Sequence, residues 1–513
     1  MLLTPDTVAK LQSALDSDLL VFIPELALCA GVVALLLARL VPALDRVHLG
    51  AVAVVALAVA LFAGGFQVCE GVWAGPYFGG MLIADAWGGF VRVLVLAAAL
   101  ITALLTLVTR VPDRADSADF YALLLGGTLG MALMSSAGHL LMVFVAVEMA
   151  SLPGYALAGF LKGKKTGSEA SLKYVVYGAA ASGVMLYGIT LLAGTFGTAT
   201  LRDVSAGIAV GGLDLPVLAG LALTSVGLGF KLAAVPFQFW CPDVFEGAAA
   251  EVAGFLSVAS KAAAVGLTGR FLLTLHESHP DGNLIPSTLG AGVAVIAMLT
   301  VTYGNLAAFA QTNLKRLLAY STIAHAGYML MALALVTKTG AAAVLYYLAA
   351  YIAMNLGAFA VIAFVRNATG SEDLSAYRGL VRRSPLLAVS MVVFLASLLG
   401  LPPLAGFAGK FQVFAAVYAA ATDAAASGPP GLGTLLYVLL AVGALNTAVS
   451  AYYYLKVGRV MLLDEPEGAP VTAGAGAALF LAALVVLLFA AGVAWEPLMG
   501  ETARAAAALG AVK

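Results

Sequence analysis

Four charged side chains stand inside long apolar runs, where an ionised group is expensive to keep. Glu148 lies in LLMVFVAVEMASLPGYALAGF, Lys231 in VGLGFKLAAVPFQFW, Lys261 in AGFLSVASKAAAVGL and Lys410 in PPLAGFAGKFQVF. Each costs roughly 2.5–3.5 kcal/mol at the centre of a membrane helix, and such residues usually mark an ion or proton path. A carboxylate and a lysine can hold each other charged, and burial favours the neutral lysine. We therefore predict a proton relay; the alternative is a set of static ion pairs that fix helix packing.

A histidine in a similar setting adds a fifth candidate. His325 stands in LAYSTIAHAGYML, beside the polar Tyr320 and Ser321. Imidazole changes its charge near neutral pH, so His325 can pass protons. A histidine that is simply hydrogen-bonded within a helix is an equally weighted alternative.

The apolar runs themselves predict an all-α polytopic membrane protein. Of the 513 residues, 62% are hydrophobic and 10% are charged, whereas a soluble domain carries about 25% charged residues. A membrane-crossing helix needs about 20 apolar residues, and we predict 14 such spans. Their approximate limits are 18–40, 47–65, 81–109, 120–138, 139–161, 170–195, 214–240, 248–274, 285–310, 314–336, 341–366, 384–422, 431–461 and 472–494.

The seventh and twelfth predicted spans are interrupted by proline. Pro236 follows Lys231 by five residues, and the run Leu401–Gly406, with two prolines, precedes Lys410. Proline removes a helix hydrogen bond, and broken backbone at membrane depth is tolerated only where protein or water satisfies it. A lysine beside such a break is an arrangement that transporters use. A proline kink without a role is the alternative.

The spacing of the candidates predicts an internal repeat. Lys231 and Lys410 are 179 residues apart, and Glu148 and His325 are 177 apart. Both separations equal five predicted spans, so we predict two five-helix units at 120–274 and 285–461. An odd number of spans makes the two copies insert in opposite orientations, as in transporters with inverted repeats. A three-helix segment (1–119) precedes them, and a last helix and tail (472–513) follow.

An even number of spans puts both termini on one side of the membrane. With the termini outside, 15 loop lysines and arginines fall inside, Arg366 among them, and six fall outside, Arg270 among them. The positive-inside rule therefore predicts outer, periplasmic termini in the inner membrane of a bacterium. The first residues lack a basic stretch and a cleavage site, so we do not expect a signal peptide.

Several kinds of chemistry are not expected in this chain. The net charge of -1 gives no electrostatic basis for nucleic-acid binding. Cys29, Cys69 and Cys241 are far apart and form no CxxC pair, so a disulfide framework, an iron–sulfur cluster and a zinc site are not expected. Nor is there a P-loop or a dinucleotide fingerprint. HESH at 276–279 reads as a solvated loop and not as a metal site. The energy for any pumping must then come from a partner or a gradient.

The motifs around these residues resemble the antiporter-like membrane subunits of respiratory complex I, the NADH-quinone oxidoreductase. The runs that carry the resemblance are VEMASLP (147–153), SEASLKY (168–174), GFKLAAVPF (229–237), WCPDVFEG (240–247), FLSVASK (255–261), LAYSTIAHAGY (318–328) and GLPPLAGF (400–407). They cover about half of the chain, the fifth to twelfth predicted spans. PDVFEG and SVASK favour the N branch of this family over its L and M relatives.

The resemblance implies a 14-helix fold with two inverted five-helix units. It implies that Glu148 and Lys231 form a gating ion pair, that Lys261 is the central relay and that Lys410 faces the outer half-channel. It also implies redox-driven proton translocation, with NADH, FMN, iron–sulfur clusters and quinone in partner subunits and none in this chain. The expected partners are neighbouring antiporter-like subunits and the lipid bilayer.

One departure from the family and two competing interpretations remain. After EG the family usually reads APTPV, whereas this chain reads AAAEV at 248–252, losing both prolines and gaining Glu251. The local geometry before the eighth predicted span is therefore open. The alternatives to a redox-driven pump are a subunit of a multi-subunit cation/proton antiporter and a passive scaffold.

Overall fold

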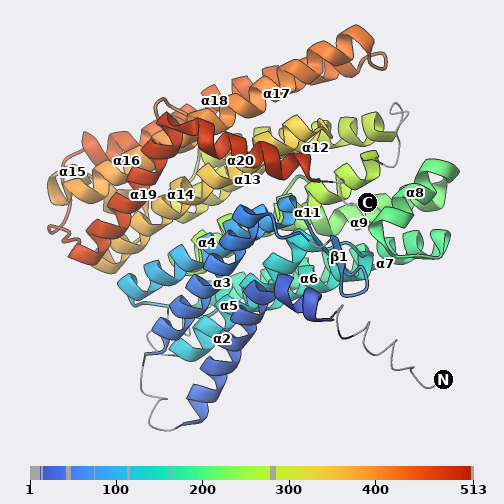
Figure 1. Cartoon of the computed structure of the whole chain (residues 1–513). Helices are drawn as coiled ribbons and strands as arrows, with labels where there is room; N and C mark the ends of the chain where they lie inside the picture. Colours follow the sequence, from blue (N-terminus) through green and yellow to red (C-terminus); the bar gives the residue numbers. More distant parts are fainter. Residues whose placement is uncertain are drawn as a thin grey trace.

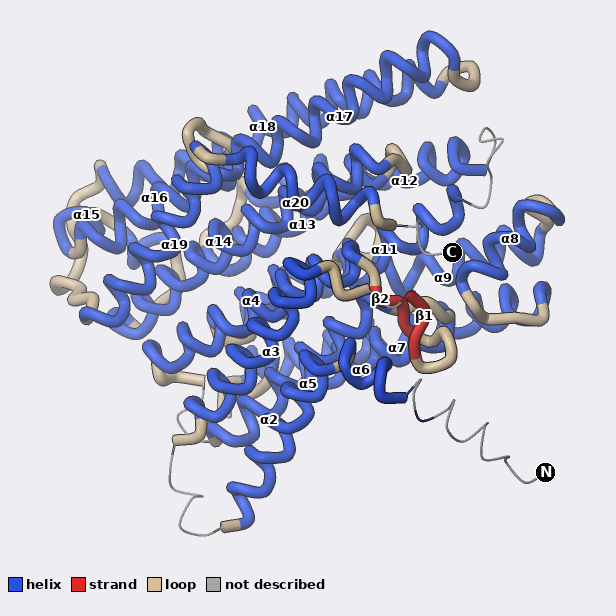
Figure 2. The backbone as a smooth tube through the Cα atoms, in the orientation of Figure 1, coloured by secondary structure: helices blue, strands red, loops and turns tan. Residues whose placement is uncertain are grey.

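The computed structural model of the chain is almost entirely helical, with one small β-hairpin (Figure 1; Figure 2). It describes residues 12, 15–41, 48–73, 75–112, 116–161, 163–277 and 285–509. The first half contains α2 (Ile23–Leu40), α3 (Gly50–Glu70), β1 (Gly75–Tyr77), β2 (Leu82–Ala84), α4 (Ala86–Thr109), α5 (Ser117–Ser136), α6 (Leu140–Ala158), α7 (Lys165–Phe196), α8 (Leu201–Gly211), α9 (Leu215–Leu232), α10 (Trp240–Gly247) and α11 (Ala250–Glu277).

The second half continues as helices joined by short connections. These are α12 (Ile285–Ala308), α13 (Leu314–Leu333), α14 (Lys338–Thr369), η1 (Leu374–Tyr377), α15 (Leu380–Arg383), α16 (Pro385–Leu399), α17 (Ala405–Ser427), α18 (Leu432–Leu462), α19 (Ala475–Val493) and α20 (Trp495–Ala507). In Figure 1 the blue and cyan helices α2–α7 lie on one side of α11, and the yellow to red helices α12–α20 lie on the other.

The predicted all-α membrane fold is confirmed. Each predicted span corresponds to one helix, except the seventh, which covers α9 and the break after it, and the twelfth, which covers the pair α16 and α17. Twelve of the described helices are long and apolar enough to cross a membrane. The others that cover predicted spans are α13, which carries Lys315, Arg316 and His325 among its residues, and the divided pair α16 and α17. The total of 14 spans stays a prediction.

The connections between helices fall on two opposite faces. β1 pairs antiparallel with β2, and isolated bridges link Leu82 to Ala137 and His139 to Thr200. These contacts bring together the loops before α4, α6 and α8. A further bridge, between Asn313 and Asp373, joins the loops that follow α12 and α14. We call the side with β1 and β2 the hairpin face and the other side the opposite face.

Two helices form the centre of the protein. The apolar window of α11 is 100% buried and that of α14 is 94% buried, whereas α2, α18 and α19 bury less than a third of theirs. α11 packs against α4, α5, α9, α13 and α14, so it touches both groups of helices. A charged or polar side chain that is buried within these windows is therefore shielded from lipid by the surrounding helices.

The predicted breaks are confirmed in both spans. α9 ends at Leu232 and the chain resumes helical structure at Trp240, while α16 ends at Leu399 and α17 begins at Ala405. The N–H of Val235, which has lost its helix partner, donates to the hydroxyl of Thr300 on α12 at 3.0 Å. A side chain of a neighbouring helix thus provides the hydrogen bond that this backbone group loses at the break.

Candidate proton-transfer site

The structure places the five predicted residues on five helices that pack around the centre. Glu148 is on α6, Lys231 on α9, Lys261 on α11, His325 on α13 and Lys410 on α17. The three lysines and the histidine are at most 5% exposed. Glu148 is partly exposed in the isolated chain.

Glu148 and Lys231 are near each other without touching. The carboxylate of Glu148 accepts a hydrogen bond from the hydroxyl of Ser182 on α7. Its charge interacts electrostatically with that of Lys231. Among the ion pairs of the described residues, none joins the two directly. The gating pair that the resemblance implies is therefore open in this structure, and its role stays a proposal.

Lys231 and Lys261 meet at the first helix break. The ammonium group of Lys261 donates to the backbone carbonyl of Lys231 at 3.1 Å. That carbonyl lies in the last turn of α9, where the helix leaves its carbonyls without intrahelical partners and carries partial negative charge. The same ammonium nitrogen lies 5.1 Å from the centre of the Trp240 ring, a distance typical of cation–π contacts.

The second break repeats this arrangement. The ammonium group of Lys410 donates to the carbonyl of Leu399, the last residue of α16, at 3.0 Å. It lies 4.6 Å from the centre of the Tyr328 ring. Each broken half-helix thus presents a terminal carbonyl to a buried lysine. The predicted equivalence of Lys231 and Lys410 stays a prediction; as the sequence indicates, Lys231 lies before its break and Lys410 lies after its break.

Polar side chains connect α11 to α13 through α14. Ser257 lies one turn before Lys261 and accepts a hydrogen bond from the amide of Asn355 at 2.7 Å. The same amide nitrogen donates to the hydroxyl of Tyr351 at 3.0 Å, and this hydroxyl donates to Thr322 at 3.0 Å. All of these residues are buried. The chain of hydroxyl and amide groups ends one turn before His325.

His325 uses both nitrogens of its ring. Nδ1 is 2.7 Å from the hydroxyl of Tyr347, and Nε2 is 3.1 Å from the hydroxyl of Tyr454. The hydroxyl of Tyr454 is also 2.5 Å from that of Ser321. A ring bonded at both nitrogens can accept a proton on one side and release one on the other. The same two bonds also satisfy a structural histidine, so the contacts fit both sequence-based interpretations.

The tyrosine and asparagine members of this network were not among the predicted residues. Tyr347, Tyr351 and Asn355 follow one another at intervals of four residues on α14. Residues four apart lie on the same face of a helix. A polar stripe of this kind within a span of high hydropathy is the sequence signal that identifies them. Tyr454 on α18 has no comparable signal, because it is the third of three consecutive tyrosines.

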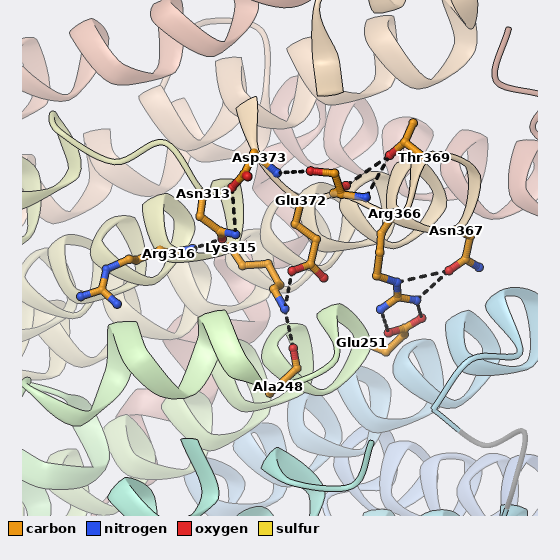
Figure 3. A network of polar contacts seen from close by, with 11 residues as sticks. Ala248, Glu251, Asn313, Lys315, Arg316, Arg366, Asn367, Thr369, Glu372 and Asp373 are labelled. Atoms are coloured by element: carbon orange, nitrogen blue, oxygen red, sulfur yellow. Dashed lines mark hydrogen bonds and ion pairs between the residues drawn. The ribbon is translucent and has the colours of Figure 1, made fainter. Parts of the chain in front are cut away.

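A charged cluster lies at the opposite-face ends of the central helices (Figure 3). Glu251, the residue gained in place of the family's proline, is fully buried and forms two hydrogen bonds with Arg366, at 2.9 and 3.0 Å. Lys315 on α13 donates to the carbonyl of Ala248 and pairs with Glu372 at 2.7 Å. These contacts hold the start of α11 to α14 and α13, which answers the open question about the local geometry.

A more exposed set of ion pairs surrounds this cluster. Asp243 on the short helix α10 pairs with Lys173 and with Arg316, each at 2.6 Å. Partial burial opposes ionisation of Asp243, but the two hydrogen-bonded cations hold the pKa of its carboxyl below its usual range. Arg316 also pairs with Glu246 at 2.7 Å. Through these ion pairs, the PDVFEG motif joins α7 to α13 at the opposite face.

Two arginines that the sequence placed in loops are buried in helices. Arg270 is 2% exposed on α11 and binds both carboxylate oxygens of Asp85 at 2.7 Å. Arg366 is 7% exposed on α14. Both were wrongly counted as loop charges, because each lies near the end of its apolar run and its partner carboxylate is far away in the sequence.

Among the described residues, no three or more histidine, cysteine, aspartate or glutamate side chains are grouped so that they could hold a metal ion. Within that part of the chain, Cys29, Cys69 and Cys241 are free thiols. His279 of the HESH run lies outside the described residues.

Comparisons with known proteins agree with this architecture. The profile of the family described as NADH:quinone oxidoreductase/Mrp antiporter, TM matches residues 137–428. NADH-quinone oxidoreductase subunit N of Anaeromyxobacter sp. (strain Fw109-5) is 41% identical over 94% of this chain and 95% of its own length.

Solved structures agree as well. A chain of respiratory complex I from Thermus thermophilus with bound aureothin is 36% identical, with a TM-score of 0.74, over 93% of this chain and 98% of its own. A chain of the Mrp complex from Dietzia sp. is 21% identical, with a TM-score of 0.77, over 96% of this chain and 97% of its own, which shows the shared fold. The chain belongs to the family of NADH:quinone oxidoreductase and Mrp antiporter membrane subunits.

Proposed function

We propose that this chain is the N-type membrane subunit of a bacterial NADH-quinone oxidoreductase and that it carries protons across the inner membrane. The observation that carries the proposal is a buried polar network between Lys261 and His325. Its members Ser257, Asn355, Tyr351 and Thr322 are joined by hydrogen bonds, beginning one turn before Lys261 and ending one turn before His325. It crosses the two most buried helices, where polar groups without a function are disfavoured.

Each predicted residue has a distinct role in this proposal. Glu148 and Lys231 exchange a proton with each other near the first break. Lys261 is the central proton carrier. His325, bonded at both ring nitrogens, links the centre to the second break. Lys410 receives the proton there and releases it towards the hairpin face, which we assign to the periplasm together with both termini.

The two five-helix units at 120–274 and 285–461 are part of the same proposal. Each contains one break, and each break presents a terminal carbonyl to a lysine. This similarity supports a duplicated origin, with 1–119 and 472–513 as flanking segments.

Electron transfer belongs to partner subunits in this proposal. NADH, FMN, iron–sulfur clusters and quinone would bind there, and neighbouring antiporter-like subunits would transmit the coupling. A subunit of a cation/proton antiporter is the second candidate, because the Mrp chain from Dietzia sp. has the same fold. Mass spectrometry of the gently solubilised assembly separates them: flavin and iron–sulfur companions support the first, and their absence from an intact assembly supports the second.

Lys231→Ala tests the relay. The assembled complex is reconstituted in vesicles, and NADH oxidation and dye-reported proton uptake are measured together. Proton uptake should fall at least fivefold while assembly is retained, since an alanine carries no proton. Lys165→Ala, which removes an exposed lysine at the start of α7, should leave uptake unchanged. A Lys231→Ala complex that assembles poorly yet pumps normally per complex would support the passive scaffold.

A further inference from the structure

An apolar cavity of about 370 Å³ lies between α9, α11 and α12. It extends from the first helix break, at Val235, towards the hairpin-face ends of these helices, at Leu275 and Leu289. α9 and α12 both pack against α11, whereas no comparable packing joins these two described helices to each other. The cavity is therefore the space between α9 and α12 that helix packing leaves open.

The lining has the chemistry of a hydrocarbon site. None of the described residues that line it is charged. The hydroxyl of Ser225 donates to the carbonyl of Leu221 at 2.8 Å, and that of Thr268 donates to Ala264 at 2.7 Å. Both groups are therefore engaged in their own helices and offer little to a polar ligand. A quinone headgroup, with two carbonyls to satisfy, is poorly matched to such a lining.

The rim of the cavity faces the surface that the bilayer covers. Four residues that line the cavity are exposed in the isolated chain: Ala222 and Ser225 on α9, and Gly292 and Ile296 on α12. Both helices are long and apolar enough to cross a membrane. The molecules that surround such a rim are acyl tails. The volume lies in the range of roughly 300–1,000 Å³ that is typical of small-molecule sites.

We propose that one acyl chain of a membrane phospholipid occupies this cavity, with its headgroup at the hairpin face and its methyl end at the break of α9. The cavity floor includes Gly229 and Leu232, on either side of Lys231. A bound acyl chain would therefore keep water of the hairpin side away from Lys231. This second consequence depends on the proposed proton path, whereas the lipid site does not.

The depth of labelling tests the site in the unaltered complex. The assembled complex is placed in nanodiscs with phosphatidylethanolamine that carries a diazirine either near the carboxyl end or near the methyl end of one chain. The first probe should label the region of Leu275 and Leu289, and the second should label the region of Leu232 and Val235. Phe271 and Leu272 are 5% and 7% exposed, so bulk lipid does not reach them and their labelling reports the cavity. An unlabelled lining, or cross-links from the lining to a neighbouring subunit, would overturn the proposal.

A pair of glycine substitutions gives a matched comparison. Gly292 lines the cavity, and a Cβ at this position meets nothing within 4 Å. Gly292→Phe should fill the space and reduce labelling of Phe271 and Leu272 at least fivefold. Gly183→Phe on α7, where a Cβ also meets open space, should leave that labelling unchanged. Equal labelling in the two variants would contradict the lipid site.

Failure of the proton relay and failure of the lipid site have different experimental signatures. Lys410→Ala removes a relay residue that does not line the cavity, so it should lower proton uptake while the lipid labelling stays at the wild-type level. Normal uptake with normal labelling would refute the relay alone. Lowered proton uptake in Lys410→Ala together with an unlabelled cavity would refute the lipid site alone.

Discussion

At the scale of single residues, the buried network depends on side chains that both donate and accept hydrogen bonds. Hydroxyl groups of Tyr347, Tyr351 and Thr322 can receive a proton on one lone pair while they release another. Lysine alone cannot do this, because a charged ammonium group only donates. The tyrosine hydroxyls can therefore take part in proton transfer, whereas the amide nitrogen of Asn355 donates to both Ser257 and Tyr351 and holds them in place.

Tyr347→Phe tests this connection by removing a single oxygen atom. His325 should lose its Nδ1 partner, and proton uptake in reconstituted vesicles should fall severalfold. The stability cost should be about 1 kcal/mol, the net value of one hydrogen bond, so assembly should be retained. Tyr187→Phe, on the exposed side of α7, is the control. Unchanged uptake in both variants would remove Tyr347 from the path.

Glu148 can be tested by separating its charge from its shape. Glu148→Gln keeps a side chain that can bond to Ser182 but cannot ionise, so proton uptake should fall at least fivefold. Glu148→Asp keeps the charge on a side chain one methylene shorter, and its uptake should stay within twofold of the wild type. If all three proteins pump equally, Glu148 does not titrate during transport.

At the scale of helices, the breaks were predictable but the contacts they make were not. Pro236 and the prolines at 402–403 predict interrupted spans from local stereochemistry alone. That Lys261, 30 residues beyond Lys231, donates to the carbonyl of Lys231 depends on how α11 crosses α9. Crossing angles and helix rotations are set by packing over the whole bundle, which a hydropathy pattern does not contain.

The same reasoning explains why the role of Glu251 could not be predicted. The sequence shows the gain of a carboxylate at the start of α11, but its partner Arg366 is 115 residues away at the end of α14. In the structure the pair links the two central helices. Such a link can replace some of the local stiffness that prolines provide in relatives with APTPV.

Glu251→Gln tests this link. Removing one partner of a buried ion pair leaves the other charge uncompensated and typically costs about 3–5 kcal/mol. The thermal inactivation temperature of the complex should therefore drop clearly. The double variant Glu251→Leu with Arg366→Met, which replaces both charges by apolar groups, should recover most of that stability. A single variant as stable as the wild type would show that the pair does not hold α11 to α14.

At the scale of the whole molecule, the alternation of loops between two faces could be predicted from span counting. The bridges Leu82–Ala137 and Asn313–Asp373 join loops that the count places on the same side. The buried Arg270 and Arg366 were miscounted as loop charges. Because Arg366 was counted inside and Arg270 outside, the excess of positive charge inside remains. The orientation itself is a property of insertion into the membrane, so it stays a prediction.

Cysteine labelling tests the orientation. In a Cys69→Ala background, Arg202→Cys on α8 lies on the hairpin face, and Glu467→Cys lies in the loop before α19 on the opposite face; both positions are exposed. An impermeant maleimide applied to intact spheroplasts should label the first variant, and should label the second only after permeabilisation. The reverse pattern would invert the proposed direction of transport.

The first lysine-capped break has a mechanical consequence. If α9 regained one turn, the N–H of Val235 would bond to the carbonyl of Lys231, which now accepts from Lys261. The second break lacks this route, because Pro402 and Pro403 have no N–H to offer the carbonyl of Leu399. The displaced ammonium group of Lys261 would then favour giving up its proton. A neighbouring subunit that pushes on α9 would in this way deprotonate Lys261 without touching it.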